Sequence, residues 1–140
     1  MKKLILDTGV QEFKIQGGGV LRFHPGDPNL YARFLQAEEK LSAMEQELTR
    51  QAKDIRDSKG VVSLLGQADK QLKALLTEIF GGENDFDKAL GGVNLLSVAG
   101  NGKTVAANLM EALEKILSEG AQRFADARVA EIKAARKTYE

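Results

Sequence analysis

Residues 97–104, SVAGNGKT, contain the residue types of a phosphate-binding loop. In the Walker A motif, G-x-x-x-x-G-K-[ST], main-chain N–H groups face the phosphates and the lysine reaches the outer ones. The run Gly102, Lys103, Thr104 matches the end of this motif, but Ser97 stands where its first glycine belongs. Such a loop also follows a parallel strand, and the chain after residue 28 shows only helical and glycine-rich patterns. We therefore predict no nucleotide site here.

The structural role that we expect for the same stretch is a tight glycine turn before the last helix. Asn and Thr are good N-cap residues because their side-chain oxygens accept hydrogen bonds from the first free N–H groups of a helix. Asn101 or Thr104 would serve in this way. Lys103 would then be an exposed residue near the start of that helix.

Other residue types that carry out chemistry are scarce. There is no cysteine, and His24 is the only histidine, so thiolate metal sites, histidine clusters and disulfides are excluded. The carboxylate pairs Glu38/Glu39 and Asp85/Asp87 lie in ordinary charge patterns without a second matching segment. We expect no catalytic residue, no cofactor and no metal, and thus a protein that is not an enzyme.

The charge balance argues against two classes of partner. The 140 residues include 20 basic and 20 acidic side chains, whereas nucleic-acid-binding modules are usually strongly basic. The N-terminal MKKLIL has only three apolar residues in a row, far fewer than a signal peptide or a membrane span needs. We expect a cytoplasmic protein that binds neither nucleic acid nor membrane.

The elements that would position any site divide into a β-like beginning and a helical remainder. Residues 3–6, 11–16 and 20–24 are short apolar or alternating runs separated by turn residues, which predicts an antiparallel β meander. The fold class expected is α+β, mainly α, in a single domain: the meander in residues 1–27 and three principal helices in residues 28–140.

The first helix should be long. Asp27 and Pro28 form a helix start, and apolar residues then recur with a seven-residue repeat for about four heptads. A helix of about 28 residues is some 40 Å long, so we expect it to project or to pack along a partner. The repeat consists of Leu30, Phe34, Ala37, Leu41, Met44, Leu48 and Ile55.

Two further helices should follow. After a polar joint that ends at Gly60, the pattern predicts a helix over residues 62–80, with Asp69 and Lys73 on its polar face. A glycine-rich loop with one helical turn at residues 85–90 would lead to a final helix over residues 104–137. The last turns of that helix are rich in alanine and charge, and we expect them to be solvated.

A family resemblance covers most of the chain. Its motifs are the N-terminal run LILDTGVQEFKIQGGGVLRFHPGDPNLYARFLQAEEKL, in which DPNLYARF opens the long helix, and the loop IFGGENDFDKALGGVN. These resemble small tail-assembly proteins, of the tail assembly chaperone kind, from siphovirus-type phages and prophages of Gram-positive bacteria.

The resemblance implies a non-enzymatic role in a bacterial host cell. A protein of this kind binds the helical tape-measure protein, keeps it soluble and helps tail-tube subunits to assemble around it. The alternative is a helical, homo-oligomeric structural or scaffold protein of a prophage without a chaperone role. On either hypothesis the chain is expected to form a homo-oligomer, through the heptad seam or an unpaired strand edge.

The first candidates for partner contact are the apolar side chains of Phe34, Leu41, Met44 and Leu48. The same stripe would also serve as ordinary intramolecular core, because most heptad stripes in small domains pack internally. The sequence leaves both possibilities open.

Overall fold

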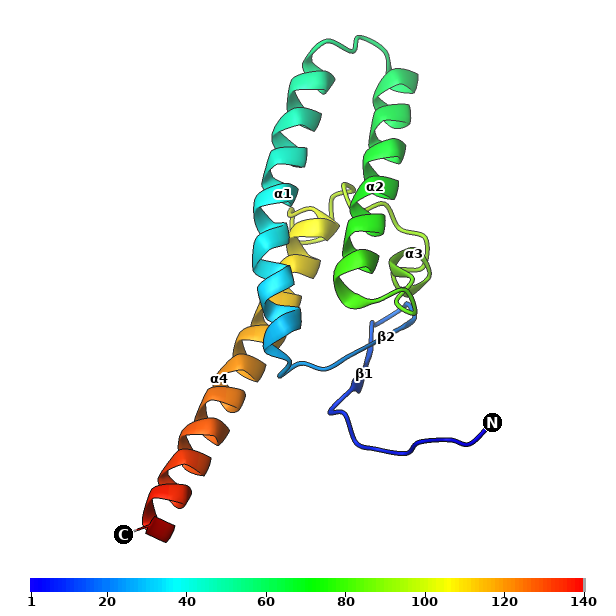
Figure 1. The fold of residues 1–140 in the computed structure, drawn as a ribbon. Helices are drawn as coiled ribbons and strands as arrows, with labels where there is room; N and C mark the ends of the chain where they lie inside the picture. Colours follow the sequence, from blue (N-terminus) through cyan, green and yellow to red (C-terminus); the bar gives the residue numbers. More distant parts are fainter. Residues whose placement is uncertain (140) are drawn as a thin grey trace.

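The computed structural model describes residues 1–139 and shows a short hairpin followed by helices (Figure 1). The expected α+β, mainly α class is confirmed. The elements in chain order are β1 (Gln11–Lys14), β2 (Val20–Phe23), α1 (Pro28–Lys53), α2 (Ser58–Phe80), α3 (Phe86–Ala89) and α4 (Val105–Tyr139).

The hairpin is antiparallel, with Phe13 opposite Leu21. Its glycine turn packs directly on the backbone of α3: the N–H of Gly19 donates to the carbonyl of Ala89 at 2.8 Å. A Cβ at Gly18 would overlap the same carbonyl oxygen. Only glycine therefore lets this turn approach α3 so closely.

The third strand predicted at residues 3–6 does not form. In the described chain β1 pairs with β2 alone, and Leu4, Ile5 and Leu6 are exposed. Residues 3–6 lead away from the hairpin (Figure 1), so in this structure they reach neither a strand to pair with nor an apolar surface to cover them.

Helix boundaries follow from local caps. Asp27 accepts a hydrogen bond from the N–H of Asn29 at 2.9 Å, as expected. Helix α1 ends at Lys53, so Ile55 of the heptad repeat lies beyond it. Helix α2 begins at Ser58, earlier than predicted, because Asp57 caps it and brings Gly60 inside the helix.

The core lies where the first half of α1, the second half of α2 and the first half of α4 meet the hairpin and α3. Phe80 is at its centre. Its ring lies 5.0 Å from that of Phe23, 5.5 Å from that of Phe86 and 6.4 Å from that of Phe34, measured between centroids. Aromatic pairs at these separations add to the stabilisation that burial provides.

Two parts extend from this core in opposite directions (Figure 1). The distal ends of α1 and α2 form a helical hairpin on one side, and the C-terminal half of α4 projects on the other. Leu113 and Leu117 of α4 are buried, whereas the side chains from residue 122 to residue 136 are exposed. Over residues 122–136 the expected solvation of the end of this helix is confirmed. Helix α1 projects together with α2, whereas the end of α4 projects alone (Figure 1).

Candidate functional site

A groove of about 400 Å³ runs between the distal halves of α1 and α2. In Figure 1 these halves stand side by side above the point where α4 and the loop before it reach them. The apolar residues that line the groove are Ala43, Met44, Leu48, Leu64, Ala68, Leu72 and Leu96. The groove therefore has an apolar part between the distal halves of two neighbouring helices.

The four predicted contact residues separate into two pairs. Phe34 is fully buried and Leu41 is 9% exposed, and both belong to the core. Phe34 and Leu41 therefore have the intramolecular core role that the sequence analysis left open. Met44 and Leu48 are half-buried and line the groove, so they remain the two that a partner reaches without opening the fold.

The rim of the groove is polar and carries no positive charge among its described lining residues. It consists of Glu45, Glu47, Gln51, Gln67 and Gln71. Hydrogen bonds from Arg50 and then from Gln51 lower the pKa of Glu47 to about 2. Glu47 is therefore a carboxylate at every physiological pH.

Of the lining residues, only Met44 and Leu48 were predicted as contact residues by the sequence analysis. Ala68 and Leu72 of α2 lie on the apolar stripe that its helical period predicted, but the period does not identify what the stripe packs against, and Leu64 lies outside that stripe. Leu96 comes from the loop before α4 and reaches the groove only through the tertiary fold. Chain-local patterns carry no signal for it.

Residues 97–104 form the predicted turn. Thr104 caps α4, since its Oγ1 accepts from the N–H of Ala107 at 3.1 Å. Asn101 accepts from the N–H of Lys103 at 3.1 Å, and Val98 pairs with Thr104 in an isolated β-bridge. The main chain of this loop bonds largely to itself.

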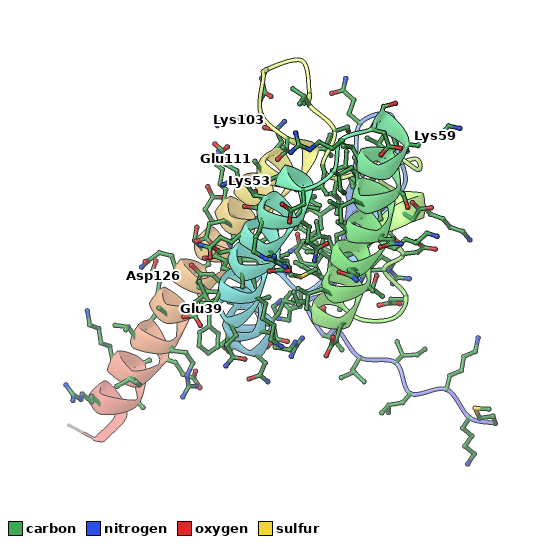
Figure 2. All side chains as sticks on the ribbon, turned by 90° about the horizontal axis from the view of Figure 1, so that it is seen from above. Glu39, Lys53, Lys59, Lys103, Glu111 and Asp126 are labelled. Carbon is green, nitrogen blue, oxygen red and sulfur yellow. The ribbon has the colours of Figure 1, made fainter. Side chains whose placement is uncertain are left out.

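The lysine of this loop has a carboxylate partner. Lys103 Nζ lies 3.2 Å from Glu111 Oε2 on α4, and Figure 2 shows the two residues next to each other at the start of that helix. A phosphate would have to compete with Glu111 for the ammonium group. This geometry supports the structural role of the loop.

A buried ionic cluster corrects the prediction that Asp69 and Lys73 lie on a solvated face. They are 9% and 6% exposed. Lys73 Nζ lies 2.8 Å from Asp69 and 2.7 Å from Asp87, and it donates to the carbonyl of Val93 at 2.9 Å. Burial opposes the charge of Lys73, but the hydrogen bonds from Lys73 to Asp69 and Asp87 outweigh it, so its pKa is raised.

This cluster ties three segments together and is fully bonded at its buried end. The other carboxylate oxygen of Asp69 accepts from the N–H of Leu95 at 2.7 Å. Lys73 thus joins α2 to α3 and to the loop that carries Leu96 into the groove. Its partners occupy it fully, and its role in this arrangement is to fix the loop.

A second polar cluster lies between α1 and α4. The hydroxyl of Tyr31 donates to Glu114 Oε1 at 2.9 Å, which raises the pKa of Tyr31. Partial burial, followed by the negative charge of Glu114, raises the pKa of Glu38. Oε2 of Glu114 is buried and has no hydrogen-bond donor within the described part of the chain.

Residues 1–139 contain neither a metal-binding cluster nor a membrane-spanning helix. No group of three or more His, Cys, Asp or Glu side chains in this range is arranged to hold a metal ion. None of the helices described there has the length and apolar character that crossing a membrane requires.

No protein-family model, curated protein or solved structure matches this chain. The groove and the sequence resemblance are therefore the two observations from which function is inferred.

Proposed function

We propose that this protein is a non-enzymatic assembly chaperone of a phage tail that binds an amphipathic helix of a tail protein in the groove between α1 and α2. The observation that carries the proposal is the half-buried pair Met44 and Leu48 in a groove of about 400 Å³ that has apolar and polar lining residues. A helix laid in a groove is one of the common modes of protein recognition, with anchors at i, i+3, i+4 and i+7.

The dimensions and charge of the groove favour such a ligand. From Met44 to Gln51 the groove follows about 10 Å of α1, or two helical turns, which is the distance between anchors at i and i+7. The rim offers two glutamates and three glutamines, and one of these glutamates, Glu47, is already paired with Arg50 at 2.6 Å. A helix with an apolar stripe flanked by basic or neutral residues fits this rim best.

The partner that the sequence resemblance suggests is the tape-measure protein, with the tail-tube protein joining the assembly. A tape-measure protein is long and helical, so its unassembled helices expose apolar stripes that aggregate unless covered. Covering such a stripe needs apolar surface and no catalysis. On this proposal the protein acts in the cytoplasm of the bacterial host.

The first test uses defined peptides. Binding of a 20-residue amphipathic peptide with lysine-flanked leucines is measured by calorimetry for the native protein, for Leu48→Asp and for Leu35→Asp. Leu35 lies on the same helix and is 44% exposed, but it does not line the groove. We expect Leu48→Asp to lose at least tenfold in affinity and Leu35→Asp to bind as the native protein does. Equal binding by all three proteins would refute the proposal that the peptide binds in this groove.

The second test addresses the tail assignment. Any tape-measure and tail-tube genes found beside this gene are co-expressed with each variant, and the soluble tape-measure protein is quantified; the absence of such genes would contradict the tail assignment. We expect the native protein and Leu35→Asp to keep it soluble and Leu48→Asp to fail. If the protein binds the peptide but does not change the solubility of a tape-measure protein, the chaperone role is refuted and the scaffold alternative is favoured.

A further inference from the structure

A second apolar groove lies on the other side of the molecule, between the hairpin and α4. Its volume is about 540 Å³. Its described lining is mostly apolar, and six of its apolar residues are only half-buried: Phe13, Ile15, Leu90, Val105, Leu109 and Ile116. Within this chain nothing described occupies the groove.

One wall of this groove is a free strand edge. The N–H of Ile15 donates to Gly19 across the hairpin at 2.9 Å. Because hydrogen-bonded positions alternate along an antiparallel strand, the N–H and C=O groups of Glu12 and Lys14 point away from β2. Such an edge is a template for a further strand.

The N-terminal segment has the apolar residues that a strand on this edge would need. It nevertheless leads away from the core. Leu4, Ile5 and Leu6 are 87%, 91% and 62% exposed. Figures 1 and 2 both show the segment before β1 leaving the core as an extended chain. An apolar tail in water is unfavourable unless another surface covers it.

The direction of the tail is set at Gly9, at the base of the hairpin. The N–H of Gly9 donates to Asp7 Oδ1 at 2.8 Å, and its φ of +84° belongs to the left-handed region. A Cβ at Gly9 would lie 2.6 Å from Nε2 of His24. Gly9 therefore packs against the imidazole ring and directs residues 1–8 away from their own groove.

We propose that the occupant of this groove is the N-terminal segment of a second copy of this chain. Residues 3–6 of each copy add as a strand to the outer edge of the other copy's β1. Since alternate side chains of a strand share a face, Leu4 and Leu6 enter the groove and Ile5 faces outward. The exchange is reciprocal, which gives a closed two-fold dimer independent of the groove between α1 and α2.

The first test is the mass of the native chain and of tail variants in light scattering over a hundredfold range of concentration. We expect a dimer for the native protein and for Ile5→Asp, and a folded monomer for Leu4→Asp combined with Leu6→Asp. Equal disruption by Ile5→Asp would show unspecific hydrophobic attraction. That result, or a dimer unaffected by the double substitution, would overturn the proposal.

The groove side has its own matched pair of variants. Ala112 and Ala107 are both exposed alanines of α4, but only Ala112 lines the groove. Ala112→Glu should raise the dimer dissociation constant at least tenfold, and Ala107→Glu should leave it unchanged. Circular dichroism of both variants confirms that α4 has formed.

A disulfide test distinguishes exchange between copies from closure within one chain. The native sequence has no cysteine, so a mixture of two differently tagged chains, one carrying Leu6→Cys and the other Ala112→Cys, can form only three crosslinks, and only the one between unlike tags joins the tail to the groove. We expect a crosslink between the two tags under mild oxidation. If it fails, and a chain carrying both substitutions closes only on itself, the tail is an intrachain strand and the proposal is wrong.

Discussion

Asn84 hydrogen-bonds to the main chain of Arg22 as a neighbouring β-strand would. Its Oδ1 accepts from the N–H of Arg22 at 2.7 Å, and its Nδ2 donates to the carbonyl of the same residue at 2.9 Å. Nδ2 also donates to the carbonyl of Phe80 at 2.8 Å. A single buried side chain thus satisfies the open edge of β2 and joins it to the end of α2.

Replacing Asn84 by leucine should be costly. The substitution keeps the volume similar but leaves the polar groups of Arg22 and Phe80 without partners, and unsatisfied buried groups cost about 1–3 kcal/mol each. We expect a loss of about 3 kcal/mol in the free energy of unfolding, measured by urea titration. Asn29→Leu, at an exposed position of α1, is the control and should change stability by less than about 0.5 kcal/mol.

Two of the glycines inside helices, Gly66 and Gly120, should respond in opposite directions to alanine. A Cβ at Gly120 would overlap the carbonyl oxygen of Pro25, whereas Gly66 has open space. We expect Gly120→Ala to lower stability by about 2 kcal/mol because helix or loop must shift. Gly66→Ala should raise it by about 0.5–1 kcal/mol, and a stabilising Gly120→Ala would contradict the close contact of α4 with residues 24–27.

Lys73→Met should be strongly destabilising. It leaves the buried Asp69 without its cation, and removing one partner of a buried pair costs about 3–5 kcal/mol. Lys70→Met is the matched control, because Lys70 is an exposed neighbour on the same helix. If both variants unfold at the same urea concentration, Lys73 does not fix the loop.

The same lysine predicts that the free energy of unfolding falls at high pH. The pKa of Lys73 is raised above 10.5 in the folded state, so its stabilisation is complete below the unfolded value and is lost as pH rises through the folded value. The difference in unfolding free energy between the native protein and Lys73→Met should therefore shrink above about pH 10.5. Urea titrations at several pH values between 8 and 12 measure it.

The polar cluster between α1 and α4 predicts that the free energy of unfolding also depends on pH in the acidic range. The folded state raises the pKa of Glu38 above 4.5, so ionised Glu38 destabilises the fold and protonation relieves it as pH falls through the folded pKa. Glu38→Gln should be more stable than the native protein at pH 7, because its amide can donate to Oε2 of Glu114. The gain should vanish near pH 4, and a constant gain at all pH values would rule out the ionisation of Glu38 as its cause.

The loop before α4 allows a comparison of neighbours. Thr104→Ala removes the cap of the helix and should cost about 1 kcal/mol. Lys103→Ala removes only an exposed ion pair, which is worth at most about 1 kcal/mol. Fluorescent ATP should bind neither variant nor the native protein; binding that disappears with Lys103→Ala would restore the phosphate-loop interpretation.

Features governed by nearby residues could be predicted from sequence. Asp27 and Thr104 start helices through their own side chains, and the apolar stripe of α1 identified Phe34 as well as the groove residues Met44 and Leu48. In each case the deciding interaction lies within one or two helical turns.

Features that depend on distant segments were missed or wrong. Asp69 was assigned to a solvated face, although it lies four residues after Leu65 and three before Leu72, within the apolar stripe of α2. What permits its burial is the arrival of the loop that includes Leu95, which no period in α2 reveals. The strand at residues 3–6 was predicted from apolar composition. Composition does not reveal whether the chain brings these residues next to another strand, and in this structure it does not.

The exposed half of α4 can change the length that it spans. Its hydrogen bonds can open without disturbing any buried side chain, so amide exchange should become faster in steps beyond Leu117 while the core stays closed. Residues 122–139 span about 27 Å as a helix and about 60 Å when fully extended. This segment of α4 can thus double in length without unfolding the core.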